Sequence, residues 1–462
     1  TEKVCSLKLK GEVDKGNKPI IVDSRVSSPA YPSPKIDDSS IVIPSGSSVR
    51  VLCPGKTNQE SSQIIEPGVV IVKDKAIKQT HVAEPIECVD DNTFKLQGKP
   101  VDFLDIECEQ KPRTSYNAIL RSADNKKCHN GDRYEVGFGM ENKDFLRTIY
   151  LCHNKHQAKT LWAHRVISPS NVVTNRYTGE SKKVFKKGML YNDMQISKED
   201  PYSLNVAYNT LSSILGSSKK ADKYLSTKTS DKKFLAKGHL IANADMLYKN
   251  EQESTYFLAN VIPMWQQVNA NPGNWFFVEE YVRHLASKKR HPLHVWVGGI
   301  GVLELEGKPF YLYRKAKSDG TFDQRLPVPK VLYKCVVDKE SKQALCFFVV
   351  NNPYASKAEV EALQNNYIVC KKHEECEKIS QKYDNPALGY MYCCELGDFY
   401  KKNKNEVGLE DVIEYLNYPA IDLIYEEKEE RSPKVSVKVK HEHRVPEHLH
   451  LGKLGVKMRH VQ

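Results

Sequence analysis

Twelve cysteines divide into two sets of six, and this partition constrains the fold more than any other feature of the chain. The first set ends at Cys152 and the second begins at Cys335. Zinc sites use short paired spacings with nearby histidines, and Cys370-x5-Cys376 is too widely spaced for one. We therefore expect disulfides, whose pairing the sequence leaves open, and an oxidising compartment. The two sets are Cys5, Cys53, Cys88, Cys108, Cys128 and Cys152, then Cys335, Cys346, Cys370, Cys376, Cys393 and Cys394.

The chain is expected to be secreted and extracellular. It begins at Thr1 without an initiator methionine or an apolar leader, which fits a mature protein after removal of a signal peptide. No run of about 18 apolar residues is long enough to span a bilayer, so we expect no membrane partner. With 462 residues, of which 40% are hydrophobic, the chain can bury a sizeable core in two or more domains.

Three regions differ in their residue patterns. Residues 1–110 contain short β-branched runs broken by Pro, Gly, Ser and Asp, which predict a small β-rich domain. It shows no catalytic group of residues, so a protein-interaction module is one interpretation of it. Residues 111–425 mix helix and strand patterns. Residues 426–462 form a basic, His-rich tail, which suits either phosphate binding or a solvated end.

The middle region predicts an α+β domain. Leu204 to Leu215 has helical apolar spacing, and the apolar residues from Trp275 to Leu285 recur every three or four positions. We expect the second helix to have Asn271 as its N-cap and Pro272 in its first turn. Residues 293–303 predict a core strand, and residues 331–337 and 344–350 predict a hairpin.

One stretch of this region carries residues suited to cleaving a phosphodiester. His239 follows Lys237 and Gly238, and an unperturbed histidine can take a proton from water near neutrality. Lys237 would place a cation beside the phosphate, although as a point charge it binds phosphate less specifically than arginine. A core histidine in a turn is the alternative for His239. Nucleic acid is the first candidate substrate, and the net charge of +11 also favours a polyanionic partner.

Asparagines and a glutamate further along could hold one hard cation. Magnesium accepts an asparagine carbonyl together with waters, and Asn271 is the first choice because Glu279 follows it at a spacing of eight residues. Asn269 is the competing ligand. Glu279 would orient a water on the ion. The alternative is that Asn271 only caps a helix and that Glu279 only faces solvent.

These residues resemble the DNA/RNA non-specific endonuclease family with a ββα-metal site, especially secreted arthropod members, including salivary nucleases of blood-feeding insects. The family pattern is D-R-G-H, then N-x-x-P-Q, then N-x-x-x-W-x-x-x-E. The matching residues, within a resemblance over about residues 110–420, are Gly238, His239, Asn260, Pro263, Asn271, Trp275 and Glu279.

The resemblance implies a magnesium-dependent endonuclease domain of mixed antiparallel sheets and helices, in which manganese can substitute. It implies His239 as general base, Asn271 as metal ligand, and Asn260 and Glu279 as supporting residues. Its substrates would be DNA and also RNA, bound through phosphates without sequence preference. Lys183 or Arg176 would take the place of a second family arginine.

Three positions depart from the family pattern. Ala236 and Lys237 stand where the family has Asp and Arg, and Met264 stands where Gln is usual. Losing one well-placed donor to the transition state can cost about 100-fold in rate. The second functional hypothesis is therefore a nucleic-acid-binding protein with weak or absent nuclease activity.

Overall fold

The computed structural model describes residues 3–14, 17–23, 25–58, 63–66, 68–73, 75–79, 83–109, 118–140, 144–172, 184–194, 196 and 199–425. The described residues as far as Ile424 belong to one compact unit. The predicted tail at 426–462 lies outside the described residues. Among the helices that are described, none combines the length and the apolar character needed to cross a membrane.

The region before residue 110 is β-rich, as its β-branched runs predict. Its strands form a five-stranded sheet in the order β11-β10-β9-β4-β2, a three-stranded sheet β12-β7-β8, and the pairs β1-β3 and β5-β6. The domain boundary near residue 110 stays a prediction. The strands are β1 (Val4–Lys8), β2 (Ile20–Asp23), β3 (Ser40–Pro44), β4 (Ser48–Leu52), β5 (Lys56–Asn58), β6 (Gln63–Glu66), β7 (Val70–Val72), β8 (Lys75–Gln79), β9 (Ala83–Asp90), β10 (Thr93–Leu96), β11 (Lys99–Asp102) and β12 (Ile106–Cys108).

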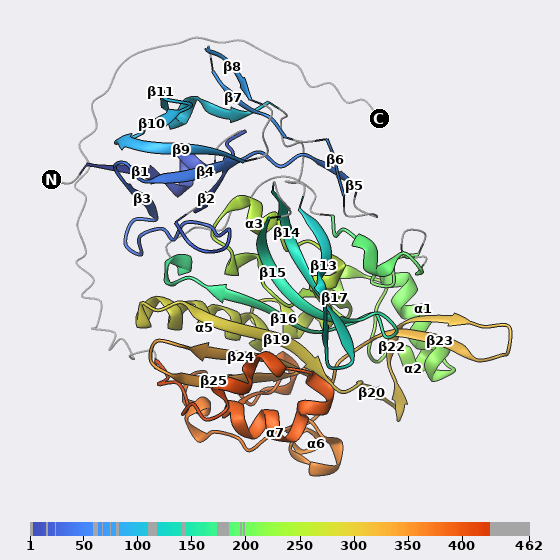
Figure 1. The fold of residues 1–462 in the computed structure, drawn as a ribbon. Helices are drawn as coiled ribbons and strands as arrows, with labels where there is room; N and C mark the ends of the chain where they lie inside the picture. The colour runs from blue at the N-terminus through green and yellow to red at the C-terminus, as the bar shows by residue number, and fades with distance from the viewer. Residues whose placement is uncertain are drawn as a thin grey trace, which may run out of the picture. The chain divides into compact units, whose positions relative to one another are not determined.

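An eight-stranded antiparallel sheet organises the rest of the chain (Figure 1). The predicted hairpin forms β24 and β25. The predicted strand at 293–303 ends three residues early, at Ile300, because the chain turns at Gly301, whose φ is +69°. In order across the sheet, the strands are β13 (Ile119–Cys128), β14 (Gly131–Gly139), β15 (Phe145–Asn154), β16 (Lys159–Ile167), β19 (Leu293–Ile300), β24 (Val331–Asp338), β25 (Gln343–Val350) and β26 (Met391–Cys394).

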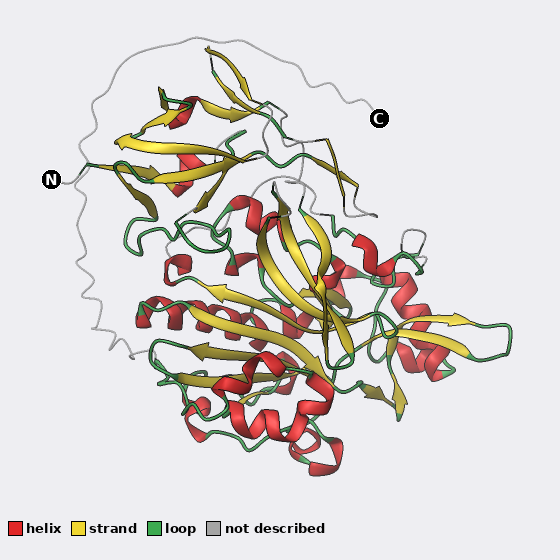
Figure 2. Cartoon of the chain, in the orientation of Figure 1, coloured by secondary structure: helices red, strands yellow, loops and turns green. Residues whose placement is uncertain are grey.

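Helices cover both faces of this sheet (Figure 2). Tyr281 of α5 contacts Phe347 of β25, with ring centroids 5.6 Å apart. Phe399 of α7 contacts Phe348, the next residue of the same strand, at 4.9 Å. Successive side chains of a strand point to opposite faces, so α5 and α7 lie on opposite sides of the sheet. The helices are α1 (Leu204–Leu215), α2 (Ser218–Ala221), α3 (Lys249–Ser254), α4 (Gln266–Asn269), α5 (Asn274–Lys289), α6 (Lys357–Glu361) and α7 (Leu396–Val407).

Two paired strands and helix α5 form a small ββα unit. The ribbon of β17 (Leu235–His239) and β18 (Val261–Trp265) leads through α4 into α5. The four apolar side chains whose spacing predicts α5 are fully buried, namely Trp275, Val278, Val282 and Leu285. The α+β class and the ββα unit are thereby confirmed. Two further ribbons are β20 (Glu304–Leu305) with β21 (Lys308–Pro309), and β22 (Tyr311–Ala316) with β23 (Phe322–Pro327).

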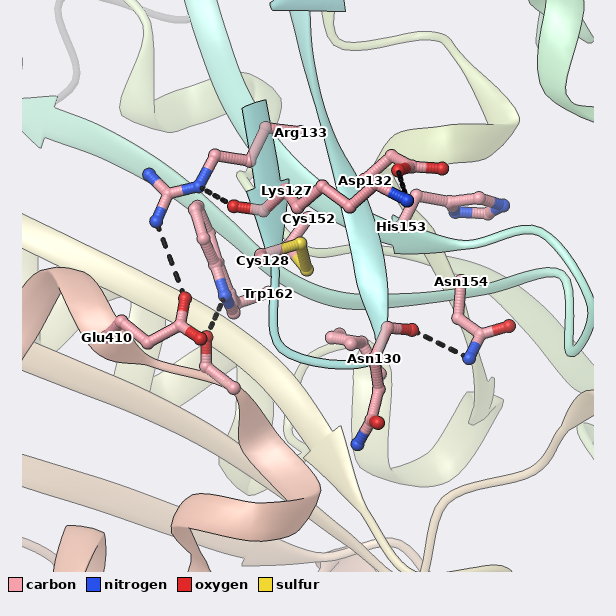
Figure 3. Close-up of a disulfide and its surroundings, with 12 residues drawn as sticks. Lys127, Cys128, Asn130, Asp132, Arg133, Cys152, His153, Asn154, Trp162 and Glu410 are labelled. Atoms are coloured by element: carbon pink, nitrogen blue, oxygen red, sulfur yellow. Dashed lines mark hydrogen bonds and ion pairs between the residues drawn. A yellow bond between two sulfur atoms is a disulfide. The ribbon is translucent and has the colours of Figure 1, made fainter. Parts of the chain in front are cut away.

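All twelve cysteines form disulfides, as the sequence predicts, and the structure shows that every pair stays within its own set. Figure 3 shows Cys128–Cys152, which joins β13 to β15 at one edge of the sheet. Beside it, Arg133 donates to the carbonyl oxygen of Lys127 at 3.0 Å. The other pairs are Cys5–Cys88, Cys53–Cys108, Cys335–Cys346, Cys370–Cys394 and Cys376–Cys393.

Candidate active site

The β17–β18 ribbon places His239 at its end, opposite Val261. Gly238 lies opposite Ile262, and a Cβ atom at Gly238 would come within 2.4 Å of the Sδ atom of Met264. Real Cβ atoms do not approach other atoms this closely, so a side chain at Gly238 would force the buried Met264 side chain to move. The absent side chain lets the two strands pack closely beside the histidine.

Asn260 holds the turn that follows His239. Its fully buried side chain accepts a hydrogen bond from the Ile241 N–H at 3.0 Å and donates to the Ile241 carbonyl oxygen at 2.9 Å. It also donates to the Thr255 carbonyl oxygen at 3.1 Å. These bonds satisfy three polar backbone groups in the interior, where leaving them unpaired would be costly. Asn260 thus supports the position of His239 through the backbone.

The half-buried His239 ring is bordered by aromatic side chains and one hydroxyl. Its centroid lies 5.2 Å from that of Phe185 and 5.1 Å from that of Tyr256. Its Nε2 atom lies 3.4 Å from Thr255 Oγ1, which donates its own hydrogen to the Gln252 carbonyl oxygen at 2.7 Å. Thr255 Oγ1 can therefore only accept from Nε2. This favours the tautomer with hydrogen on Nε2, in which Nδ1 is the basic nitrogen.

Lys237 forms an ion pair with an acidic residue from a distant part of the sequence. Its Nζ lies 2.6 Å from Asp200 Oδ2, and the two side chains are 25% and 39% exposed. The ammonium also lies 5.6 Å from the ring centroids of Phe185 and of Tyr202. The cation expected beside a phosphate is thus paired with a carboxylate within the protein.

Two of the departures from the family pattern face each other across the ribbon. Ala236 of β17 lies opposite Met264 of β18, and Met264 is fully buried. Directly opposed residues in an antiparallel pair point to the same face and contact each other. An apolar pair therefore occupies the place where the family pattern has Asp and Gln.

The proposed metal ligands lie on the segment between β18 and α5. Asn269 is the last residue of α4, which contacts both β17 and β18, and Asn271 is exposed in the following turn. The expectation that Asn271 is the N-cap of α5 is wrong. The cap is Gly273, and the helix begins at Asn274, whose buried amide donates to two backbone carbonyls of the residue 382–389 segment. Glu279 lies half-buried in the second turn of α5.

A buried charge cluster connects α5 with the residues that follow β17. Asp245 accepts from Arg283 NH1 at 2.8 Å and from Lys334 Nζ at 3.0 Å. Burial by itself would raise the pKa of Asp245, but the two cations outweigh it and hold the pKa below its usual value. Burial by itself would lower the pKa of Arg283, but the carboxylates of Asp245 and of Glu279, one helical turn before it, raise the pKa above its usual value. The cluster thereby ties the Glu279 helix to the His239 segment.

The residues present suit a hard divalent cation. The asparagines of the α4–α5 turn and Glu279 offer only oxygen donors, which magnesium prefers. Among the described residues, one group of three His, Cys, Asp or Glu side chains has its potential metal-ligand atoms within 4.8 Å of one another. The group consists of His373, Cys376 and Cys393. Its two cysteines form a disulfide and offer no thiolate.

The remaining expected residues, Lys183 and Arg176, lie outside the described residues. Sequence reasoning missed Asp200, Thr255 and Phe185. No pattern links Asp200 to a lysine 37 positions away, since only the fold brings the two together. The adjacent Glu199-Asp200 acidic pair is the one local signal that could have drawn attention to this segment.

Comparisons with known proteins find one matching family model and similar salivary proteins. A family model described as DNA/RNA non-specific endonuclease matches residues 129–399. A protein named "Salivary endonuclease" from Lutzomyia longipalpis is 26% identical over 278 residues, which cover 59% of this chain and 61% of that protein. "Salivary protein Tsal1" from Glossina morsitans morsitans is 24% identical over 330 residues, which cover 69% of this chain and 75% of the relative.

A solved structure also matches part of the chain. It is titled "Crystal structure of the EndoG/EndoGI complex: Mechanism of EndoG inhibition". The match has 18% identity and a TM-score of 0.27, and it covers 44% of this chain and 71% of the other. A score this low carries no argument about the present fold.

Proposed function

This chain belongs to the DNA/RNA non-specific endonuclease family, and from that premise we propose that it is a secreted, metal-dependent endonuclease. Its substrate is DNA and, as a second candidate, RNA. The observation that carries the proposal is the setting of His239, at the end of the ribbon in a ββα unit, with Nε2 facing an accepting hydroxyl.

In the proposed mechanism His239 acts as the general base. Thr255 Oγ1 accepts from Nε2–H and holds the ring, so that Nδ1 takes the proton from the attacking water. Asn260 keeps the turn after His239 in place and does not itself react. Lys237 supplies positive charge near the phosphate once its pair with Asp200 is broken.

The proposed metal site consists of Asn271, with Asn269 as the alternative ligand and Glu279 in support. Magnesium, or manganese in its place, would neutralise charge on the phosphate and the leaving oxygen when bound. Glu279 orients water at this site from a helix that the Arg283–Asp245 pair anchors. Both asparagine side chains are neutral, so they would not cancel the positive charge of a bound cation. That charge would stay available to the substrate phosphate.

Binding is proposed to be sequence-nonspecific. The net charge of +11 favours phosphates, and phosphate contacts carry no base information. Six disulfides suit an extracellular protein, and relatives are named as salivary proteins. Secretion and the domain division at residues 1–110, 111–425 and 426–462 are part of this proposal.

One observation favours the second candidate function, a nucleic-acid-binding protein with little catalysis. Lys237 is already paired with Asp200, and Ala236 and Met264 replace two polar family positions. The ion pair leaves less free positive charge for the transition state, and the two apolar replacements remove polar groups beside it, while the fold stays intact.

The test is cleavage of supercoiled plasmid with magnesium or EDTA, beside a gel shift on the same DNA. His239→Ala is compared with His284→Ala, which alters an exposed histidine of α5. For an endonuclease, His239→Ala lowers cleavage about 100-fold or more and leaves binding unchanged, whereas His284→Ala changes neither. Binding without metal-dependent turnover in the unmodified protein would establish the second candidate instead.

A further inference from the structure

The ion pair between Lys237 and Asp200 lies at the proposed phosphate site. Lys237 is two residues before His239 in the same strand, and its Nζ lies 2.6 Å from Asp200 Oδ2. A carboxylate oxygen at this distance makes the contact that a phosphate oxygen would make with the same ammonium. Asp200 thus stands in for an anionic ligand.

The pair is held in place by the fold around it. Asp200 begins the turn into α1, where its Oδ1 accepts from the Tyr202 N–H at 3.0 Å and its carbonyl oxygen accepts from the Ser203 N–H at 2.9 Å. One carboxylate oxygen fixes the turn while the other binds Lys237. Phe185 and Tyr202 border the ammonium, which limits where Lys237 can point.

The pair is also weak enough to be opened. Asp200 is 39% exposed, and ion pairs that reach water contribute little because solvent screens them. Phosphates of a nucleic acid bring several negative charges at once. They can therefore replace Asp200 on Lys237, at the cost of leaving the Asp200 carboxylate close to the bound phosphate.

We propose that Asp200 sets the affinity of this site for nucleic acid by competing with a substrate phosphate for Lys237. This inference rests on the proposed function, because it takes the phosphate beside His239 as the ligand of Lys237. It adds a residue that determines affinity and lies outside the three family motifs. Asp200 lowers affinity in the unmodified protein, and its removal exposes a stronger anion site.

The test measures binding of a 20-base-pair DNA duplex to Asp200→Asn over a series of salt concentrations. Asparagine retains the oxygen that accepts from Tyr202, so the turn into α1 is kept. The matched control is Asp384→Asn, since Asp384 pairs with Lys357 at 2.7 Å and is 37% exposed. Both variants remove one negative charge from a similar ion pair, and only one pair is at the proposed site.

We expect Asp200→Asn to lower the Kd about fivefold in low salt, and Asp384→Asn to change it less than about twofold. Because a phosphate contacts Lys237 in both complexes, the slope of log K against log salt should stay close to that of the unmodified protein in Asp200→Asn. Lys237→Met removes that contact and should make the slope shallower by about 0.9. Equal effects of the two Asp→Asn variants, or no gain in Asp200→Asn, would overturn the inference.

Plasmid cleavage by the same samples separates the two proposals. Tighter binding by Asp200→Asn without cleavage by any variant supports the role of Asp200 and rejects nuclease activity. Cleavage by the unmodified protein, with equal binding by Asp200→Asn and Asp384→Asn, supports the nuclease and rejects the role of Asp200.

Discussion

Lys334 Nζ lies 3.0 Å from Asp245 Oδ2 in the interior, and both side chains are fully buried. Arg283 of α5 binds the other carboxylate oxygen at 2.8 Å. Asp245 follows His239 by six residues, and Arg283 follows Glu279 by four. One carboxylate therefore connects the central sheet, the helix of the proposed metal site and the segment after the proposed base.

Replacing Asp245 should destabilise the protein strongly. Asp245→Asn leaves two buried cations without a counter-charge, and breaking a buried pair in this way typically costs about 3–5 kcal/mol. The measurement is urea unfolding with the disulfides intact. The control is Asp384→Asn, whose solvent-exposed ion pair should contribute little to stability because water screens it. Similar urea midpoints for the two variants would show that the ion pairs of Asp245 contribute little to stability.

Asn260 should affect both stability and activity. Asn260→Ala removes three hydrogen bonds and leaves the backbone groups of Ile241 unpaired in the core, which should cost about 2–3 kcal/mol. Cleavage should fall at temperatures where the variant remains folded, because the turn after His239 loosens. Circular dichroism melts and cleavage rates at 20 °C below the melting point check this.

A suitable control for Asn260 is Asn365→Ala. Asn365 donates to the Glu359 carbonyl oxygen at an exposed site. Both melting and cleavage should stay close to those of the unmodified protein. A folded Asn260→Ala variant with full activity would contradict the supporting role of this side chain.

The two asparagines of the α4–α5 segment should differ in their effect on metal dependence. With Asn271 as ligand, Asn271→Ala should raise the magnesium concentration for half-maximal cleavage about tenfold or more, and Asn269→Ala should change it little. EDTA should stop cleavage in every variant. A magnesium titration of the cleavage rate makes the comparison, and the reverse order would assign the ligand to Asn269.

Stability should depend on pH through Asp14. Burial, helped by the nearby Glu251 carboxylate, raises the pKa of Asp14 from 3.8 to about 7, although the Lys249 N–H that Asp14 accepts opposes this. The folded state therefore favours the neutral acid. This contribution is fully present below pH 3.8 and is lost as the pH rises through about 7.

The variant Asp14→Asn isolates this effect. Its melting temperature should match that of the unmodified protein near pH 4 and exceed it above pH 7, by the equivalent of about 2 kcal/mol after allowance for partial exposure. Asp37→Asn, at a side chain that is 81% exposed, is the control for removing a surface carboxylate. A pH-independent difference for Asp14→Asn would show that Asp14 ionises normally in the folded protein.

Local patterns predicted the secondary structure around the site well. The periodicity of Trp275 and Val278 predicts α5 because a helix that packs on a sheet must bury one stripe. The N-cap was predicted two residues too early, since Asn271 has the right side chain for a cap but Gly273 takes that position. Packing of Asn274 against the 382–389 segment sets where the helix starts, and no local pattern contains that contact.

The sequence by itself determined the α+β class, the use of the cysteines in disulfides, and the order of His239, Asn260, Asn271 and Glu279. Apolar periodicity and motif spacing are local properties, so they can be read along the chain. Only the tertiary structure decided that Asp200 pairs with Lys237, that Thr255 orients His239, and that Asp245 bridges a helix and the sheet. These contacts join residues that are distant in sequence, or side chains whose orientation depends on packing. They set the electrostatics of the site, because nearby charges and burial decide which groups are ionised.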